Sequence, residues 1–408
     1  MRSKSPRTAR DALVLRPLER VLYGAVIRLA RWSGIWRRGR DARGDLERMG
    51  LLDKIYWVYK TTAPVRHARR GSDLEAYFAA PQRRACALPA GFDEHRTATV
   101  TAAGDLGPHP WLARSTGKLH HDVADLLFGA DLAMANLECV AEPPDAGVLR
   151  FDSRSGPTLA LDREELDAIL GHGGAASGFV ATACNHSLDY DAAGVDTTIA
   201  ALRRRGLAFH GICARGDEPS LPTIVERAGV RLGLVAWTFG LNGRRPPLDR
   251  PGIVASMDLG GRAAEVDLAP LARQLDACRR AEVDFVIAHL HWGLEHEMYP
   301  TPDQVALAHR MAELGVDAIV GHHPHVIQPW ELYRTRRDPG SPRPDLLLAR
   351  QPRKPVHRAL ALPRGRRAPR AREGQPPRRA AHLRRDVRAP RGRSGARRRE
   401  RDDPPAPP

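Results

Sequence analysis

The chain has 408 residues, 42% of them hydrophobic, which is enough to bury a substantial core in one large domain or two ordinary ones. Its formal net charge of +16 is unevenly distributed: residues 1–70 hold 18 Lys and Arg against 6 Asp and Glu, residues 334–408 hold 24 against 7, and residues 71–333 carry the remaining net charge of −13. Because the excess of positive charge lies at the two ends rather than in a patch on the middle of the chain, the sequence argues against a protein that binds nucleic acid specifically.

Residues 1–92 form a basic extension in which we expect two amphipathic helices. Apolar residues recur near helical spacing over residues 12–35 and again over residues 45–60. Arginines together with Trp32 and Trp36 in the first segment are typical of a helix that lies on an anionic membrane surface. The alternative, which we favour, is a helical hairpin packed on the main domain or on a partner.

Three features bear on where the protein is found. The apolar run over residues 18–30 is interrupted by Glu19, Arg20 and Arg28, so it does not have the pattern of a signal peptide. No segment reaches the roughly 20 consecutive apolar residues that span a bilayer. Five cysteines without a Cys-x-x-Cys pair favour reduced thiols over a disulfide framework or a zinc knuckle. We therefore expect a protein that is cytoplasmic or peripheral at the membrane.

Residues 93–335 form a domain in which strands and helices alternate. The expected strands are residues 99–103, 131–136, 178–183, 231–237, 283–290 and 318–321, and the expected helices are residues 120–128, 162–170, 192–205, 265–280 and 302–314. Asp162, three residues before Glu165, and Thr301 before Pro302 are helix-start signals. This alternation predicts α/β layers around a buried sheet.

Residues 336–408 are rich in Arg, Pro and Ala and contain no Phe, Tyr or Trp. Because this segment has too few apolar residues to offset the entropy of an ordered chain, we expect a disordered basic tail. Its charge would attract polyanions only non-specifically.

Polar side chains follow five of the expected strands. In chain order they lie in Gly104-Asp105, Asn136-Leu137-Glu138, Asn185-His186, His289-Leu290-His291-Trp292-Gly293 and Gly321-His322-His323-Pro324-His325. Ligands of α/β sheets bind beyond the carboxyl ends of the strands, so these carboxylates, amides and imidazoles are expected at one edge. Such a mixture suits divalent metal ions, and two ions about 4 Å apart can clamp the attacking and leaving oxygens of a phosphoryl transfer.

Taken alone, most of these segments have a structural explanation. Asn185 can be a helix N-cap beside a surface His186, and a lone His291 is more often a core histidine with satisfied hydrogen bonds. Three imidazoles within four residues, His322, His323 and His325, have little structural purpose at a strand end. The set at successive strand ends therefore predicts a metal site.

In this order the motifs resemble the CapA family of capsule or poly-gamma-glutamate synthesis proteins, which is related to calcineurin-like metallophosphoesterases. The resemblance covers roughly residues 97–333 and rests on five segments: Gly104-Asp105, Ala135-Asn136-Leu137-Glu138, Asn185-His186-Ser187-Leu188-Asp189-Tyr190-Asp191, His291-Trp292-Gly293-Leu294-Glu295 and Gly321-His322-His323-Pro324-His325-Val326. It implies a four-layer α-β-β-α sandwich with a dinuclear centre of divalent ions such as Mn, Zn or Fe.

Carried over residue by residue, the resemblance implies a set of roles. The implied metal ligands are Asp105, Glu138, Asn185, His291, His323 and His325, with His322 as an alternative to one of the other two histidines of its segment. His186 is implied as a proton donor to the leaving group or a contact for the transition state. Asn136 and Glu295 are implied as catalytic-site groups that orient the ligands.

The sequence departs from the family pattern at two places. Related enzymes open with Asp-x-His, whereas here Leu106-Gly107 follow Asp105 and the nearest histidine is His109, which leaves the number of ions open. After Leu346-Leu347-Leu348, basic sequence replaces an expected Gly-Asn-Phe motif. We hypothesise a reading-frame shift between residues 337 and 348, which resequencing tests: the hypothesis fails if no alternative frame encodes that motif.

Two functions remain open at this level. The first is a metal-dependent hydrolase of phosphoesterase type that acts on a phosphorylated or polyanionic substrate in poly-gamma-glutamate or capsule biosynthesis. The second is a non-catalytic metal-binding scaffold subunit of a membrane-associated polymer synthase, docked through the N-terminal helices. Specific binding of nucleic acid is not expected.

Overall fold

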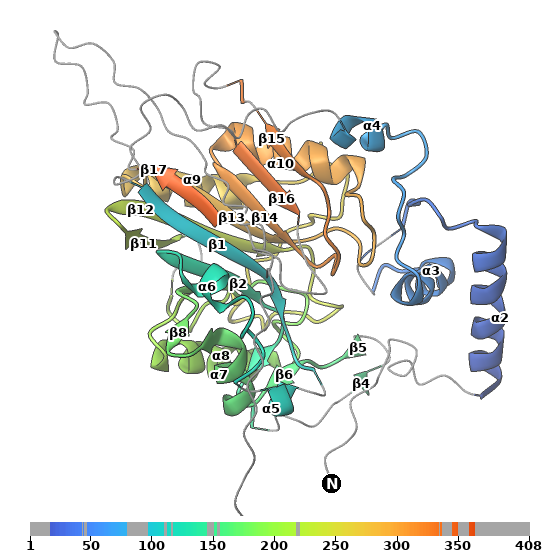
Figure 1. Cartoon of the computed structure of the whole chain (residues 1–408), viewed down its shortest axis with the longest axis horizontal. Coiled ribbons are helices and arrows are strands. Elements are labelled where there is room, and N and C mark those ends of the chain that lie inside the picture. The colour runs from blue at the N-terminus through green and yellow to red at the C-terminus, as the bar shows by residue number, and fades with distance from the viewer. Residues whose placement is uncertain are drawn as a thin grey trace, which may run out of the picture.

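The structure of the protein is a computed structural model (Figure 1). The described residues are 17–42, 44, 47–79, 97–109, 112–115, 117–144, 151–152, 156–217, 221–333, 335–336, 345–349 and 359–363. Within these ranges, no helix combines the length and the apolar content needed to cross a bilayer.

Two mixed sheets organise the domain. The first has the strand order β10 (Ala208–His210), β9 (Phe179–Ala181), β2 (Leu132–Leu137), β1 (Thr97–Leu106) and β17 (Ala359–Pro363). The second has the order β11 (Thr223–Arg227), β12 (Val230–Thr238), β13 (Phe285–His291), β14 (Ala318–His322), β16 (Asp345–Ala349) and β15 (Trp330–Tyr333). Strands β1, β2, β9 and β10 run parallel in the first sheet, as do β12, β13, β14 and β16 in the second. Parallel strands bring their carboxyl ends to one edge, which is where the site lies.

The sheets pack face to face through one apolar core. Met134 of β2 and Phe179 of β9 belong to the same buried cluster as Leu232 and Leu234 of β12 and Val320 of β14. Every residue of β2 and of β14 is buried, as expected for central parallel strands covered on both faces.

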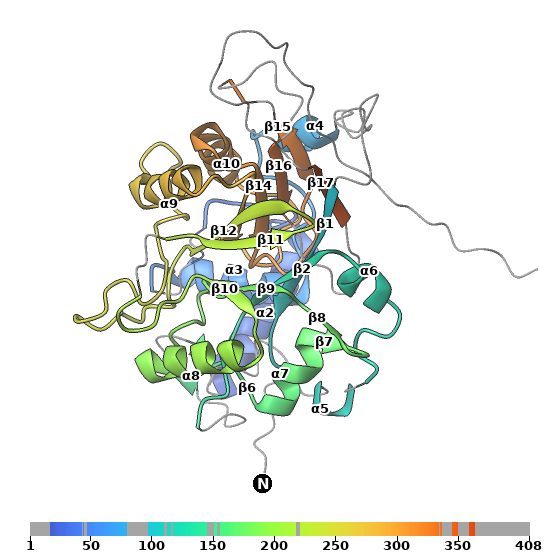
Figure 2. The same ribbon diagram turned by 90° about the vertical axis from the view of Figure 1, so that its left-hand side faces the viewer.

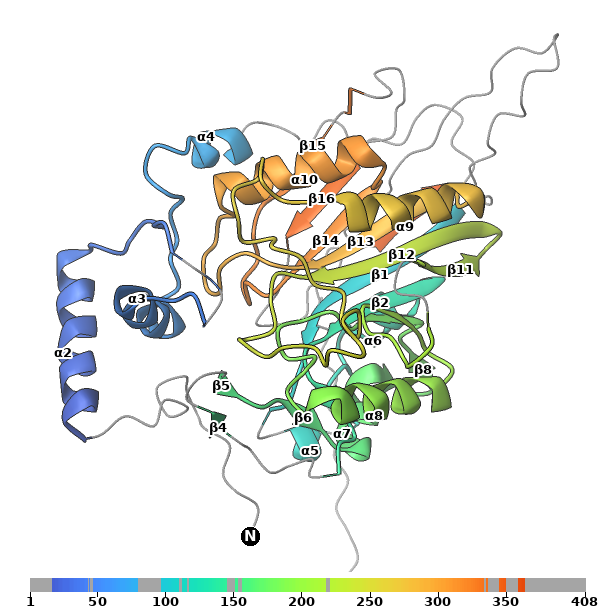
Figure 3. The same cartoon turned by 180° about the vertical axis from the view of Figure 1, so that it is seen from behind.

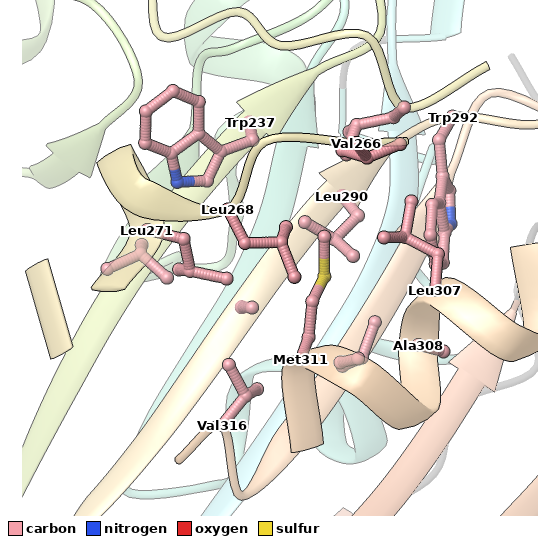
Figure 4. Close-up of a cluster of buried hydrophobic side chains, with 14 of the residues drawn as sticks. Trp237, Val266, Leu268, Leu271, Leu290, Trp292, Leu307, Ala308, Met311 and Val316 are labelled. Atoms are coloured by element: carbon pink, nitrogen blue, oxygen red, sulfur yellow. The ribbon is translucent and has the colours of Figure 1, made fainter. Parts of the chain in front are cut away.

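Helices cover the outer faces of both sheets, as Figures 1 and 2 show. Helices α9 (Ala269–Arg280) and α10 (Pro302–Leu314) lie on the second sheet, where Leu271 and Met311 pack with Leu290 of β13 (Figure 4). Helices α7 (Arg163–Leu170) and α8 (Asp191–Arg204) lie on the first sheet, where Leu166 and Leu202 join its other cluster. Mixed α/β layers with parallel sheets are therefore confirmed.

Both predicted helix-start signals are confirmed. The Asp162 side chain accepts a hydrogen bond from the Glu165 backbone N–H at 2.9 Å, and the Glu165 side chain accepts one from the Asp162 N–H. At α10, Thr301 Oγ1 accepts from the Gln304 backbone N–H at 3.1 Å. These reciprocal bonds satisfy N–H groups that a helix start leaves unpaired.

The N-terminal extension contains α2 (Pro17–Ser33), α3 (Leu51–Thr62) and α4 (Leu74–Ala79). Ile27 and Ala30 of α2 pack with Trp36 and Tyr56 in a separate apolar cluster. Helix α3 lies between α2 and the sheets, so α2 is the outer helix (Figures 1 and 3). The two predicted helices are present, and α3 contacts the α/β domain directly, as described below.

Short elements complete the described chain. They are helices α5 (Leu112–Ser115) and α6 (Ala124–Phe128), and the paired strands β3 (Val140–Ala141) with β6 (Ala160–Leu161), β4 (Phe151–Asp152) with β5 (Gly156–Pro157), and β7 (Gly171–His172) with β8 (Ala175–Ala176). The helix expected over residues 120–128 is thus shorter, because residues 120–123 form turns.

Two segments of the expected disordered tail are strands. Strand β16 lies between β14 and β15, and β17 pairs antiparallel with β1. The expectation of disorder from residue 336 onward is therefore wrong for residues 345–349 and 359–363. The physical reason is that β1 and β14 would otherwise present unpaired backbone groups at an edge, which these segments satisfy. The remainder of residues 337–408 lies outside the described residues.

Candidate metal centre

The predicted polar residues converge where the two sheets meet. Asp105 lies near the end of β1 in register with Asn136 of β2, and His291 at the end of β13 is in register with His322 of β14. Asp105 Oδ1 lies 3.2 Å from His322 Nδ1, so the contact joins the first sheet to the second. The expectation that these strand ends share one edge is met by this geometry.

Asp105 is the most densely contacted carboxylate of the centre. Its Oδ1 accepts a hydrogen bond from Asn136 Nδ2 at 2.8 Å, and its Oδ2 accepts one from the His323 backbone N–H at 3.0 Å. His325 Nδ1 lies 3.4 Å from Oδ2. Burial alone would raise the pKa of Asp105, but His322 and the other neighbouring imidazoles hold that pKa well below its ordinary value.

Three overlapping groups of side chains could each hold a metal ion. Within each group, one ligand atom per residue lies within 4.8 Å of the others. The groups are Glu138, His291 and His323; Glu295, His323 and His325; and Asp105, Glu138 and His325. Because they share members, they form one continuous centre of three carboxylates and three imidazoles.

His291 is oriented by two asparagines. Asn136 Nδ2 donates to His291 Nδ1 at 3.2 Å, so the ring proton is on Nε2, which donates to Asn185 Oδ1 at 2.9 Å. The same Nε2 lies 3.4 Å from Glu138 Oε1. A cation would take the place of that proton, with Asn185 and Glu138 beside it. Asn185 is itself held by Asn242 Oδ1, which accepts from its Nδ2 at 3.2 Å.

The loop after β14 aims two imidazoles back at the centre. His323 and His325 have φ values of 90° and 52°, a left-handed conformation that costs non-glycine residues of order 1–3 kcal/mol. The His323 ring packs against Phe239 with a centroid distance of 4.7 Å, and its backbone is held by Asp105. The surrounding contacts therefore stabilise a backbone conformation that is intrinsically unfavourable for histidine.

Burial keeps two of the imidazoles neutral, whereas the neighbouring carboxylates raise the pKa of the third, His325, well above its ordinary value. Burial lowers the pKa of His291 to about 3 and the pKa of His323 well below its ordinary value, so both rings are neutral, as metal ligation requires. Burial, reinforced by the Asp105 charge, raises the pKa of Glu138 to about 8. His325 and Glu295 lie 3.5 Å apart (Nε2 to Oε1).

His186 is paired with Asp189 rather than with the ligand groups. Its Nδ1 lies 2.8 Å from Asp189 Oδ2, and both side chains are buried. Burial lowers the pKa of His186, but the Asp189 charge and hydrogen bond outweigh it, so the pKa is raised above its ordinary value. His186 can therefore carry a proton near neutral pH, and any proton that it delivers leaves from Nε2.

His322 and His289 lie beside the candidate ligand groups rather than within them, unlike His291, His323 and His325. His322 Nδ1 faces Asp105, and His322 Nε2 lies 3.1 Å from His289 Nδ1 with the two rings stacked. Neither residue belongs to any of the three groups found among the described residues, and the exposed His109 does not either. Of the alternatives in residues 322–325, the groups contain His323 and His325.

Several neighbours of the centre were not predicted. Phe239 packs on His291 and His323, and Asn242 orients Asn185. Asp189 lies three residues after His186 in the segment from Asn185 to Asp191, a spacing that could have indicated the pair. Trp57 of α3 donates a hydrogen bond from Nε1 to Glu295 Oε2, and no local pattern could have indicated that contact.

The donor set fits divalent metal ions. Each ion pair that Asp105, Glu138 and Glu295 form within the described residues is with a histidine, so no Lys or Arg there neutralises these three carboxylates. In the same ranges, Asn136 Oδ1 and His323 Nδ1 are buried atoms without a hydrogen-bond partner. Carboxylates, imidazoles and buried polar atoms without partners, gathered in one place, are the chemistry that a divalent cation satisfies.

A family comparison covers most of the α/β domain. The sequence model of the bacterial capsule synthesis protein PGA_cap matches residues 99–339, which is more than half of the chain and contains every residue of the candidate centre. The chain belongs to the PGA_cap family. The resemblance to CapA proteins is thereby confirmed.

Two relatives of this chain are named for capsule or PGA biosynthesis. The chain is 32% identical over 151 residues to a capsule biosynthesis protein CapA of Bacillus anthracis, covering 37% of this chain and 35% of that protein. It is 27% identical over 154 residues to a PGA biosynthesis protein CapA of Bacillus subtilis, covering 37% and 38%. The matches thus span little more than a third of these relatives. A hypothetical protein of known structure from Thermus thermophilus has a TM-score of 0.34 at 20% identity, covering 62% of this chain and 75% of that one.

Proposed function

We propose that this chain is a divalent-metal-dependent hydrolase of phosphoesterase type that acts in poly-gamma-glutamate or capsule biosynthesis. One observation carries the proposal. Three overlapping groups of ligand atoms from both sheets converge at the strand ends, next to a buried His–Asp pair. A structural metal site would need one closed group of ligands and no proton donor beside it.

The finer features belong to the same proposal. We propose two ions, because Glu138, His323 and His325 each belong to two of the three groups and can serve neighbouring ions. Manganese, zinc and iron all suit a set of imidazoles and carboxylates. The order of helices, sheet, sheet and helices supports the four-layer metallophosphoesterase arrangement.

Bound metal would supply Lewis-acid activation of a phosphoryl oxygen and of the attacking water. The chain's own residues do the rest. Asn136 fixes the His291 tautomer, and Asp105 holds the backbone of His323. His186, kept protonated by Asp189, is placed to donate a proton from Nε2 to a leaving oxygen. The substrate class that fits is a phosphorylated or polyanionic molecule, since bound divalent ions and a protonated His186 would face its negative charge.

One observation favours the second candidate, a scaffold subunit of a membrane-associated synthase. Helix α2 buries Ile27 and Ala30 on one face yet leaves Leu29 61% and Trp32 84% exposed on the other, followed by Ile35 at 69%. An apolar face of this kind beside several arginines is typical of a docking surface for a partner or for anionic lipid. Docking and hydrolysis are compatible, so the assay below decides whether the hydrolase proposal stands.

The test is hydrolysis of bis(p-nitrophenyl) phosphate by the full chain with Mn²⁺ or Zn²⁺ added. We expect turnover that disappears with chelator and in Glu138→Ala, and that falls strongly in His186→Gln although this variant still binds metal. Absence of turnover from folded, metal-loaded protein would remove the hydrolase proposal and leave the scaffold. Turnover that persists in Glu138→Ala at undiminished rate would show that the activity lies elsewhere.

A further inference from the structure

A residue of the N-terminal extension reaches the candidate centre. Trp57 of α3 donates its indole Nε1–H to Glu295 Oε2, across 238 positions of sequence. The extension lies outside residues 99–339, which the family model matches. We infer that the extension is a positioning element of the metal centre and that Trp57 acts on it by fixing the carboxylate of Glu295. The inference rests on the proposed metal centre.

The geometry gives the two oxygens of Glu295 separate tasks. Oε2 accepts from Trp57, whereas Oε1 lies 3.5 Å from His325 Nε2, on the side of the group that Glu295 forms with His323 and His325. An indole N–H can only donate, so it cannot compete for a cation. The hydrogen bond to Oε2 fixes the rotamer of the Glu295 side chain and leaves Oε1 available as a ligand atom. Residues that do not bind a metal themselves commonly tune a metal site in this way.

Helix α3 holds the same loop at a second place. Lys60 Nζ lies 2.8 Å from Glu297 Oε1, and Tyr56 Oη donates to that oxygen at 3.2 Å. Lys60 and Glu297 are 2% and 5% exposed, and Lys60 Nζ also lies 4.7 Å from the centre of the Tyr56 ring. A buried pair with a third hydrogen-bonding partner holds the loop tightly, because separating it would leave a charge unpaired.

Backbone hydrogen bonds join the loop of residues 295–298 to the extension and to the segment that follows β14. The Val65 N–H donates to His296 O at 2.8 Å, and the Met298 N–H donates to Val65 O at 2.9 Å. The His296 N–H in turn donates to Pro324 O at 2.7 Å. Residues 295–298 therefore form a bridge between the extension and the segment that carries His323 and His325. A shift of α3 would be transmitted to Glu295 and to that segment.

Simple docking would not require the Trp57 contact. The Glu297 pair and the Val65 bonds already attach the extension, whereas Trp57 contacts the one carboxylate of the loop that faces two candidate ligands. A docking role predicts that Trp57 affects only the free energy of unfolding. A positioning role predicts that it affects metal affinity, and only while the Glu295 carboxylate is present.

A double-mutant cycle on the full chain separates these roles. Trp57→Phe keeps an aromatic ring but removes the N–H donor, and Glu295→Gln removes the ligand charge. Binding of Mn²⁺ is measured by titration calorimetry for the wild type, both single variants and the double variant. We expect Trp57→Phe to weaken Mn²⁺ binding about 10- to 100-fold, the usual effect of losing such an orienting partner. The double variant should bind no more weakly than Glu295→Gln alone.

Controls keep the outcomes distinct. Trp32→Phe, on the exposed face of α2, should bind Mn²⁺ like the wild type. Two outcomes would overturn the positioning role while leaving the metal centre intact. In the first, Trp57→Phe binds Mn²⁺ with wild-type affinity. In the second, the fold-losses of Mn²⁺ affinity in the two single variants multiply in the double variant. If instead neither the wild type nor any variant binds Mn²⁺ or Zn²⁺, the metal centre itself fails, and the positioning role fails with it.

A second measurement uses the unaltered chain, in case Trp57→Phe loses stability. Zn²⁺ is added to protein carrying ¹⁵N-labelled indoles, and the Trp57 N–H resonance is followed by NMR. Because ligation withdraws electron density from the Glu295 carboxylate, it should weaken the indole hydrogen bond and move that resonance upfield, with the Trp32 resonance unmoved. A Trp57 resonance that stays in place at saturating Zn²⁺ would overturn the inference.

Discussion

The backbone N–H of His323 donates to Asp105 Oδ2 at 3.0 Å, so a carboxylate of the first sheet holds a left-handed residue that follows the second. This contact couples the candidate metal centre to the fold, because the side chain that would bind a cation also stabilises the loop that supplies two other candidate ligands.

Asp105→Asn tests that coupling without metal. The amide can keep only part of the charge-assisted bonding, and a buried bond to a charged group contributes roughly 1.5–3 kcal/mol. We expect the free energy of unfolding in chelator, measured with urea, to fall by about 2 kcal/mol. Asp122→Asn, whose side chain is 97% exposed, should change it by less than about 0.5 kcal/mol. Equal stability of the two variants would mean that Asp105 does not hold the loop.

His186 and Asp189 are expected to act on the reaction rather than on metal content. His186→Gln should lower kcat for bis(p-nitrophenyl) phosphate roughly 100- to 10,000-fold, the usual contribution of a positioned proton donor. Asp189→Asn should lower kcat less, since it removes only the group that keeps His186 protonated. Metal analysis of both variants should match the wild type. Full kcat in His186→Gln, measured on metal-loaded protein, argues against any role in proton transfer.

Lys60 is expected to be important for stability because its charge is buried with Glu297. Lys60→Met leaves that carboxylate unpaired in an apolar surrounding, which typically costs about 3–5 kcal/mol. The measurement is the free energy of urea unfolding. Lys54→Met, at an exposed position of the same helix, is the matched control and should change it by less than about 0.5 kcal/mol. A Lys60→Met chain as stable as this control would contradict the buried pair.

His210 predicts an acid limit of stability outside the metal centre. Its Nδ1 accepts from the Ala236 N–H at 2.8 Å, so protonation would place two N–H groups against each other. Burial lowers its pKa to about 4, against 6.5 in an unfolded chain. Between pH 6.5 and pH 4, His210 is therefore protonated in the unfolded chain but not in the folded chain. The free energy of unfolding consequently falls as the pH drops toward 4.

That loss should amount to about 3 kcal/mol at most, from a difference of roughly 2.5 pKa units at 1.36 kcal/mol each. Urea unfolding at pH 7.0 and pH 4.5, in chelator, compares the wild type with His210→Gln. We expect the variant to be less stable at pH 7.0 but to lose less stability on acidification. The same pH dependence in both chains would assign the effect to other groups.

The sequence predicted the centre better than its surroundings. Asp105, Glu138 and His291 could be placed because parallel strands bring their carboxyl ends to one edge, whatever the loops do. The different orientations of His322 and His323 depend on a left-handed φ at His323, which is imposed by tertiary contacts rather than by local preference. Trp57 was beyond prediction, because helical spacing shows that a residue is buried but not which distant side chain it contacts.

The tail shows the opposite limit. Composition predicted disorder after residue 335, and only Leu346-Leu347-Leu348 hinted at a strand. The structure places that segment between β14 and β15, because pairing with a sheet edge depends on backbone groups that every residue except proline supplies. Composition therefore does not exclude short strands that complete an existing sheet.

Metal analysis of the purified full chain tests the central claim most directly, with His323→Ala as its partner. His323 belongs to two of the three ligand groups, so its loss should affect both. We expect one to two equivalents of Mn, Zn or Fe per wild-type chain after purification without chelator, and a clear reduction in a His323→Ala chain that remains folded. Wild-type protein that holds no stoichiometric metal, and takes up none when Mn²⁺ or Zn²⁺ is added, would contradict the account.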